Sequence, residues 1–246
     1  MSESQHVTDS IYADKQGQVQ GFRFDDKVTR VFADMIRRSV PGYGLTLQMI
    51  GVIAAQYAQK NSRLYDLGCS LGAATLAMRH GIQAEGCEIV AVDNSQAMLD
   101  QCSGYIASDD GDVPVVLTCA DIQDSEIENA SVVVLNFTLQ FIPVDEREAL
   151  LKRVFNGLRA GGVLVLSEKI SFDDTGKNDS QTQLHEVFKC SQGYSELEVS
   201  QKRQALENVL IPESLEAHHA RLKQAGFTGS QTWFQCFNFA SMLAFK

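Results

Sequence analysis

One short segment combines a buried strand, a glycine-rich turn and the start of a helix: Tyr65-Asp66-Leu67-Gly68-Cys69-Ser70-Leu71-Gly72. Gly68 allows a backbone conformation that few residues adopt, and Gly72 allows the helix to pack tightly on the strand. In doubly wound α/β folds such a turn binds a nucleotide-type ligand at the carboxyl end of the strand. The dinucleotide fingerprint G-x-G-x-x-G lacks its middle glycine here, because Ser70 occupies that position. Together with the carboxylate of Asp66, this favours a ligand that has an ammonium group and no phosphates.

Three further strand ends carry polar side chains that suit a ribonucleoside. Asp93 ends the second apolar run, where a carboxylate can accept hydrogen bonds from both ribose hydroxyls. Asp121 follows the third run and can accept from the exocyclic amino group of adenine, while Ile122 can pack on the ring. Asn136 ends the fourth run and faces the centre of the crevice. A lone aspartate at a strand end is more commonly a helix N-cap, but four polar strand ends in register favour ribonucleoside binding.

Five apolar runs predict the strands that position these residues: 63–68, 87–93, 113–119, 131–137 and 162–168. They are apolar at both alternating positions, which is typical of strands buried on both faces of a parallel sheet. Most are separated by stretches with a helical pattern, at 73–80, 95–107 and 144–158. Two final β signals, 231–238 and 240–246, have a very short link and predict an antiparallel hairpin at one edge. We therefore expect an α/β fold with a doubly wound, mostly parallel seven-stranded sheet and a C-terminal antiparallel hairpin.

The organisation of the chain follows from these elements. Residues 1–20 are polar and are predicted to form a flexible N-terminal segment, and residues 21–246 a single ligand-binding domain. Asp25 is the expected N-cap of a helix that must end before Pro41, and a second helix covers about 45–59. These two helices would form a cap over about 21–60. The mostly polar, helical insert over about 170–228 is where we expect substrate specificity.

Composition limits the classes of function. The chain has 246 residues and a formal net charge of −10, which disfavours a tight nonspecific grip on nucleic acid. No apolar run reaches the ~18 residues of a membrane span. The N-terminus lacks the apolar core of a secretion signal, so we expect a cytoplasmic protein. The six cysteines lack C-x-x-C and zinc-finger spacing, so reduced thiols and no metal are expected.

The motif YDLGCSLGAATL at 65–76, with the aspartates that end the second and third runs, resembles the class I S-adenosylmethionine-dependent methyltransferase superfamily. A closer resemblance, to carboxy-S-adenosyl-L-methionine synthases, covers nearly the whole chain after about residue 20. Its further motifs are RSVPGY (38–43), VLNFTLQF (134–141), LSEK (166–169), GYSELEVSQKR (193–203) and WFQCFNF (233–239). The resemblance implies conversion of S-adenosyl-L-methionine and prephenate into carboxy-S-adenosyl-L-methionine and phenylpyruvate. The product would supply carboxymethylation of the wobble uridine of certain tRNAs by a second enzyme.

The same resemblance implies a homodimer and a set of residues that contact the nucleoside ligand. Arg203 is implied to bind the carboxylate of the ligand; the other contacts are Tyr43, Gly68, Cys69, Ser70, Asp93, Asn94, Asp121, Ile122 and Asn136. The residues themselves leave two interpretations of Arg203, which helical spacing places on one stripe with Val199 and Leu206. An arginine there needs a partner or a route to water. Its head could reach solvent or bind a carboxylate in a planar, two-point geometry.

Two other functions remain open from the sequence. One is a small-molecule methyltransferase with the same ligand site, and the other is a non-catalytic partner of a tRNA-modifying enzyme that binds an adenosyl ligand. The sequence around Arg203 favours the synthase, because a methyltransferase for neutral acceptors would not require it. No histidine stands at a strand end, and His218-His219 is interpreted as a solvated helical pair. No catalytic residue is therefore assigned, and neither stable direct tRNA binding nor membrane association is expected.

Overall fold

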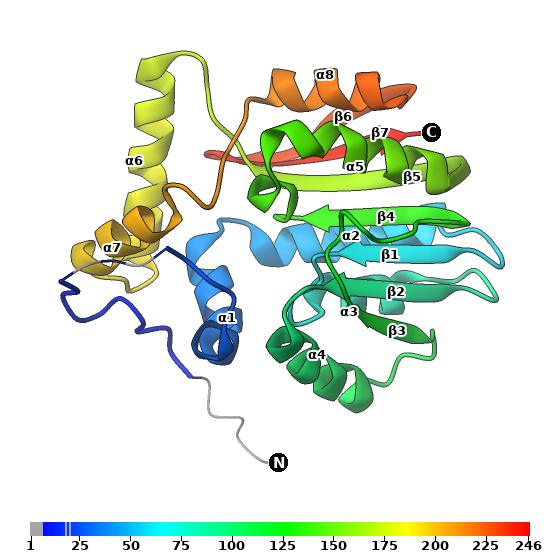
Figure 1. The fold of residues 1–246 in the computed structure, drawn as a ribbon, viewed down its shortest axis with the longest axis horizontal. Helices are drawn as coiled ribbons and strands as arrows, with labels where there is room; N and C mark the ends of the chain where they lie inside the picture. The colour runs from blue at the N-terminus through cyan, green and yellow to red at the C-terminus, as the bar shows by residue number, and fades with distance from the viewer. Residues whose placement is uncertain (1–6, 18, 20) are drawn as a thin grey trace.

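A computed structural model describes residues 7–17, 19 and 21–246. Seven strands form one sheet in the order β3-β2-β1-β4-β5-β7-β6 (Figure 1). Their bounds are β1 (Arg63–Leu67), β2 (Glu88–Asp93), β3 (Val115–Cys119), β4 (Ala130–Asn136), β5 (Leu158–Lys169), β6 (Gly229–Cys236) and β7 (Phe239–Phe245). Strands β1 to β5 are parallel, whereas β7 pairs antiparallel with both β5 and β6. The predicted fold class and terminal hairpin are confirmed.

Helices cover both faces of the sheet, and further helices lie beyond the carboxyl ends of its parallel strands. Their bounds are α1 (Asp26–Ser39), α2 (Tyr43–Tyr57), α3 (Ala73–Gly81), α4 (Gln96–Ser108), α5 (Val144–Gly157), α6 (Thr175–Ser191), α7 (Glu196–Leu206) and α8 (Leu215–Ala225), with a short 3-10 helix η1 (Leu139–Phe141). In Figure 1, α1, α6 and α7 lie beyond the carboxyl ends of the strands, apart from the helices that flank the sheet. Among the described residues, no helix is long and apolar enough to cross a membrane.

The central strand β4 shows how the sequence builds the two halves of the core. Its side chains alternate between the faces of the sheet, because a strand has a period of two residues. Val132 and Val134 join a buried cluster with residues of α2 and α3, such as Ile50 and Met78. The neighbouring Val133 joins the cluster that α5 and α8 cover. A strand buried in this way on both faces must be apolar at nearly every position, which is the pattern seen in its sequence.

The cap helices begin and end close to where the sequence places them. The Asp25 side chain accepts hydrogen bonds from the backbone N–H groups of Lys27 and Val28, which confirms it as the N-cap of α1. Helix α1 ends at Ser39, before Pro41. Helix α2 begins after Gly42, whose φ is +77°, and a Cβ there would lie 2.4 Å from the Phe234 ring. Only glycine fits this turn, so the chain can reverse closely against the terminal hairpin.

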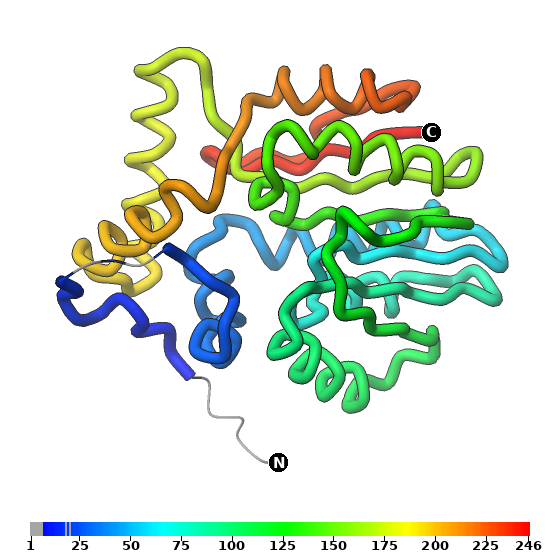
Figure 2. Tube along the Cα trace, in the orientation of Figure 1, coloured from blue at the N-terminus to red at the C-terminus, as the bar shows by residue number. Residues whose placement is uncertain are grey.

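The sequence predicts a flexible segment over residues 1–20, and the described residues of this stretch make specific contacts with the helices. Asp9 is 2% exposed, and its backbone N–H donates to Asp34 Oδ2 of α1 at 2.8 Å. The Gln201 side chain of α7 donates to the carbonyl of Tyr12 at 2.9 Å. Figure 2 shows this stretch, in dark blue, passing α7 before the chain enters α1. The partners lie far away in sequence, so local polarity could not reveal them; residues 1–6, 18 and 20 lie outside the described residues.

Helix α8 corrects the interpretation of His218 and His219 as a solvated pair. His218 is 1% exposed, because it shares a helical face with Leu215 and Leu222 at i−3 and i+4, and α8 packs on α5 through that face. Burial lowers the pKa of His218 to about 4, so its imidazole is neutral. His219 contacts the hydroxyl groups of Ser230 and Thr232 on β6 instead.

Candidate active site

A cavity of about 950 Å³ lies at the carboxyl ends of the parallel strands, between the sheet and helices α1, α6 and α7. Parallel α/β sheets bind ligands at this edge, where the strand order reverses. The cavity brings together all ten residues that the sequence proposes for ligand contacts: Tyr43, Gly68, Cys69, Ser70, Asp93, Asn94, Asp121, Ile122, Asn136 and Arg203. They come from four strand ends and two helices, so the tertiary fold brings residues of separate sequence motifs together in the wall of one cavity.

The turn after β1 is held in an unusual backbone conformation. The N–H groups of Gly68 and Cys69 both donate to the carbonyl of Val92 on β2, at 2.8 and 2.9 Å. Gly68 has a φ of +82°, and a Cβ there would lie 2.3 Å from the Thr138 side chain. Ser70 also has a positive φ, of 51°, which is uncommon for a residue other than glycine. Such strained positions cluster at binding sites, where the surrounding contacts hold them.

The carboxylate of Asp93 connects β2 to this turn. Its Oδ2 accepts the backbone N–H of Ser70 at 2.8 Å, and its Oδ1 accepts that of Ser95 at 2.9 Å. A carboxylate offers about four acceptor positions, so two remain for the hydroxyl groups of a ribose. The next residue, Asn94, donates from Nδ2 to Asp121 Oδ1 at 2.7 Å. The ends of β2 and β3 are thereby fixed relative to one another.

The end of β4 contributes an unsatisfied acceptor. Asn136 Oδ1 is buried and has no hydrogen-bond partner among the described residues. A buried amide oxygen without a partner is costly, and this side chain lines the cavity. The following Phe137 has a φ of 62°, and its ring lies 6.3 Å from that of Tyr43. A ligand that donates an N–H or O–H group at Asn136 would satisfy the free oxygen.

Asp66 is the deepest acid of the cavity. It is 1% exposed and accepts a hydrogen bond from the Thr75 hydroxyl at 2.6 Å. Burial raises its pKa to about 6, and the neighbouring charge of Asp93 acts in the same direction. A cationic ligand group would favour the ionised form of Asp66 and offset this desolvation. The acidic side of the cavity thus suits a ligand that carries positive charge.

Arg203 lies at the rim of the cavity and not on the buried stripe that the sequence predicts. Its side chain is 63% exposed and pairs with Glu186 of α6 at 2.8 Å. The buried face of α7 runs through Val199, Lys202 and Ala205 instead. Val199 lies at the edge of that face. Lys202, three residues later, therefore points inward, and Arg203, four residues later, points toward solvent.

Three lysines that the sequence did not indicate line the same cavity: Lys169, Lys189 and Lys202. Lys202 is 6% exposed, and its Nζ donates to the Ser39 hydroxyl at 2.9 Å. Burial lowers the pKa of both Lys189 and Lys202 to about 8. Lys169 is the last residue of β5, so the strand-end rule that identified Asp93 and Asn136 applies to it as well. Lys189 and Lys202 lie on helices whose burial only the tertiary structure reveals.

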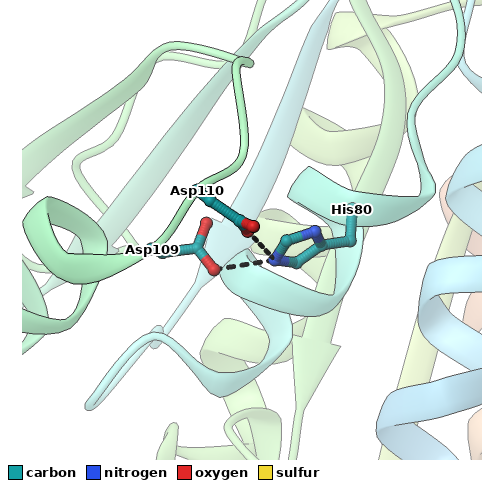
Figure 3. Close-up of side chains that lie close together, drawn as sticks. All are labelled: His80, Asp109 and Asp110. Atoms are coloured by element: carbon teal, nitrogen blue, oxygen red, sulfur yellow. Dashed lines mark hydrogen bonds and ion pairs between the residues drawn. The ribbon is translucent and has the colours of Figure 1, made fainter.

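His80, Asp109 and Asp110 form the one group with metal-ligand spacing among the residues described (Figure 3). His80 Nε2 lies 2.7 Å from Asp109 Oδ2 and 3.9 Å from Asp110 Oδ1. Arg79 already pairs with Asp109 at 2.9 Å, and none of these residues lines the cavity. The group is therefore part of a network of polar contacts between α3 and the end of α4, separate from the ligand site.

Comparisons with known proteins agree with this geometry. A family model described as a methyltransferase domain matches residues 64–162. Carboxy-S-adenosyl-L-methionine synthase of Citrifermentans bemidjiense is 57% identical, covering 97% of this chain and 98% of the relative. That of Geobacter metallireducens is 58% identical over 98% and 99% of the two chains. The structure of an O-methyltransferase family protein from Burkholderia thailandensis superposes with a TM-score of 0.64 at 15% identity, over 91% of this chain and 60% of that one.

Proposed function

This chain belongs to the carboxy-S-adenosyl-L-methionine synthase family, and on that premise we propose that it carboxylates S-adenosyl-L-methionine with carbon dioxide released from prephenate. The observation that carries the proposal is the division of one cavity into two sides. Carboxylates at the ends of β1, β2 and β3 form one side, and cationic side chains of β5, α6 and α7 form the other. A cationic nucleoside and an anionic second substrate can therefore lie next to each other.

The acidic side suits the adenosyl group. In the proposed complex the ribose hydroxyls donate to Asp93, the adenine amino group donates to Asp121, and Ile122 packs on the ring. Asn136 Oδ1 accepts a hydrogen bond from the ligand, so this buried oxygen gains the partner that it lacks in the free protein. The Tyr43 ring faces the sulfonium end, where an aromatic face attracts a cation. Burial raises the pKa of the Tyr43 phenol, so it stays neutral and protonated at physiological pH.

The reaction balances without a strong side-chain base. Prephenate loses its ring carboxylate as carbon dioxide and its ring hydroxyl as hydroxide, and the ring becomes aromatic. The hydroxide takes a proton from the sulfonium methyl group and leaves as water. The resulting ylide carbon attacks carbon dioxide, and the new carboxylate binds the Arg203 guanidinium, displacing Glu186. The protein holds the two reactants together and stabilises developing charge, which is where most of the rate enhancement in such sites originates.

Three wider proposals follow from the family. The product supplies the carboxymethyl group for the wobble uridine of tRNA through a second enzyme, and the protein acts in the cytoplasm as a homodimer. Exposed apolar side chains occur on α2, α6 and the start of α7, and an interface between two copies would be one way to bury them: Leu45, Val52, Leu184, Val187 and Leu197. Light scattering during gel filtration tests the dimer, and a monomeric mass at micromolar concentration would contradict it.

Isotope transfer tests the reaction directly. The purified protein is incubated with S-adenosyl-L-methionine and prephenate that carries ¹³C in its ring carboxylate, and the nucleoside products are analysed by mass spectrometry. We expect a product that is heavier than S-adenosyl-L-methionine by one labelled carbon dioxide, together with unlabelled phenylpyruvate. An unlabelled carboxylated product would exclude prephenate as the donor. Formation of S-adenosylhomocysteine with a methylated acceptor would instead support the methyltransferase alternative.

Replacing Asp93 with alanine is expected to weaken S-adenosyl-L-methionine binding by about 1.5–3 kcal/mol, the usual contribution of hydrogen bonds to a charged group. Calorimetric titration measures the affinity. Asp93→Asn separates the effect of the negative charge from that of the hydrogen bonds to the turn after β1. The amide removes the charge but still offers one acceptor oxygen to the turn. Asp100→Ala is the control, since Asp100 is exposed on α4 and bonds to Gln96. Unchanged affinity in Asp93→Ala would remove this residue from the ribose site.

A further inference from the structure

The cationic side of the cavity contains two lysines without a protein partner. Lys169 ends β5 and Lys189 lies on α6, and both line the cavity. Neither ammonium group makes a hydrogen bond or an ion pair with a described residue; each is affected only by burial and by nearby charges. The two lysines influence one another, since the charge of Lys169 contributes to the lowered pKa of Lys189. Two like charges held together in a partly buried site are unfavourable unless a ligand compensates them.

The neighbouring side chains supply only part of that compensation. The negative charge of Glu186 acts on both Lys169 and Lys189 and raises their pKa values, but burial lowers both pKa values by more. The group contains four cationic side chains, those of Lys169, Lys189, Lys202 and Arg203, and two carboxylates, those of Asp9 and Glu186. Glu186 pairs with Arg203 at 2.8 Å, and Asp9 lies 3.5 Å from Lys202. An excess of two positive charges therefore remains on Lys169 and Lys189, in a chain whose overall charge is −10. This concentration of charge favours a small anionic ligand.

His185 adds no charge to this group. Burial lowers its pKa to about 3, and the positive charges of Lys189 and Lys169 act in the same direction. Its Nε2 lies 2.8 Å from the carbonyl of Ser39, and because a carbonyl only accepts, Nε2 carries the proton. The ring also packs edge-on against Phe239 at 4.8 Å. The neutral imidazole and the phenyl ring thus form an apolar wall beside the two ammonium groups.

We propose that Lys169 and Lys189 bind the carboxylate of the 2-oxo acid side chain of the second substrate, which is the carboxylate that survives the reaction. This inference rests on the proposed function and assigns the subsite that orients prephenate. Ammonium groups form charge-assisted hydrogen bonds with a carboxylate, and the apolar wall suits the carbon chain that joins it to the ring. Binding the side chain at this point leaves the two departing groups free of the lysines: the ring carboxylate, which shares its ring carbon with the side chain, and the hydroxyl at the opposite end of the ring.

Transition-state chemistry favours the side-chain carboxylate over the ring carboxylate. The ring carboxylate loses its negative charge as it leaves as carbon dioxide, so an ammonium group paired with it would stabilise the ground state more than the transition state. Such pairing would slow the reaction. The side-chain carboxylate keeps its charge throughout, so binding it through the lysines costs nothing at the chemical step. The two lysines therefore act as positioning residues for the donor.

Phenylpyruvate provides the direct probe, because it retains only the side-chain carboxylate. Its dissociation constant is measured by calorimetry with S-adenosyl-L-methionine present, for the wild type, Lys169→Met and Lys189→Met. Each substitution is expected to weaken phenylpyruvate binding by about tenfold to a hundredfold. The KM for prephenate should rise by a similar factor, while the affinity for S-adenosyl-L-methionine stays within about twofold. Lys177→Met is the matched control, since Lys177 is exposed on the same helix as Lys189 and lies over the Phe172 ring.

The stability of the variants and a conservative substitution distinguish ligand binding by the lysines from a structural role. Because each ammonium group is unpaired in the free protein, the methionine variants should be as stable as the wild type or more stable. Lys189→Arg should recover much of the phenylpyruvate affinity, since it keeps the charge. Unchanged phenylpyruvate affinity and KM, an equal loss for both ligands, or a clearly less stable methionine variant would each overturn the assignment.

The two proposals fail in distinguishable ways. If labelled prephenate transfers no carbon dioxide but phenylpyruvate still binds through the lysines, the anion subsite stands and the donor is another 2-oxo acid. If prephenate is used and the lysine variants bind phenylpyruvate as well as the wild type, only the subsite assignment fails. A wild-type protein that turns over prephenate but does not bind phenylpyruvate at all would also overturn the subsite assignment.

Discussion

Arg147→Ala is expected to lower the free energy of unfolding by about 3–5 kcal/mol, the usual effect of breaking a buried ion pair. Arg147 lies on α5 and is completely buried. Its guanidinium donates to the carbonyls of Ile142, Gln140 and Ile211, at 2.9, 3.2 and 2.9 Å, and pairs with Glu213. The substitution removes the guanidinium donor from all three carbonyls, although the Gln140 carbonyl still accepts the backbone N–H of Ile211 at 2.9 Å. It also creates a cavity.

The functional consequence follows from where these acceptors lie. Gln140 lies within the short helix η1, Ile142 directly follows it, and both residues line the ligand cavity, so the buried guanidinium fixes one wall of the site. Glu213 keeps its second partner, Arg221, at 2.5 Å. The connection between α7 and α8 therefore stays partly anchored in the variant. We expect a folded but less stable protein that binds S-adenosyl-L-methionine more weakly.

Urea unfolding followed by circular dichroism measures the change. Arg63→Ala is the matched control, because Arg63 is likewise an ion-paired arginine, here with Glu88 and Glu128, but its side chain is 39% exposed. Exposed pairs contribute little, so its loss should cost less than about 1 kcal/mol. Equal effects of the two substitutions would mean that the buried network contributes no more than a surface ion pair.

Arg203→Ala is expected to weaken binding of carboxy-S-adenosyl-L-methionine by about 2–5 kcal/mol, or about 30-fold to several thousand-fold, because in the proposed complex the bound ligand covers the guanidinium that is exposed in the free protein. Binding of S-adenosyl-L-methionine should change much less. The two ligands differ by one carboxylate, so the comparison cancels effects on folding and on the adenosine side of the cavity. Because Arg203 pairs with Glu186 in the free protein, part of the gain on binding is offset by breaking that pair. The measured effect should therefore fall in the lower half of the range.

Two further variants sharpen this test. Arg203→Lys should recover only part of the affinity, because an ammonium group keeps the charge but lacks the planar fork of a guanidinium. Glu186→Gln removes the competing carboxylate and should strengthen binding of the carboxylated ligand. Dissociation constants for both ligands are measured by calorimetry for each protein. Equal losses for the two ligands in Arg203→Ala would make Arg203 a structural residue and would favour the small-molecule methyltransferase.

The sequence by itself determined the framework and the acidic side of the cavity. Strand and helix periods are local properties, so the alternation of elements, the hairpin and the N-cap at Asp25 could be read directly. The ends of parallel strands meet at one edge of a sheet, so Asp93, Asp121 and Asn136 had to lie close together once the fold class was clear. Lys169 obeys the same rule at the end of β5.

Only the tertiary structure decided which helix faces are buried and which distant residues meet. Helical spacing shows that Val199 and Arg203 are near each other, but the packing of α7 on the N-terminal segment turns Lys202 inward and leaves Arg203 exposed. The burial of Asp9 likewise depends on helices α1 and α7. The excess charge of Lys169 and Lys189 exists only because a strand end and a separate helix face one cavity. Such long-range proximity leaves no periodic signal in a sequence, since it depends on how finished elements pack.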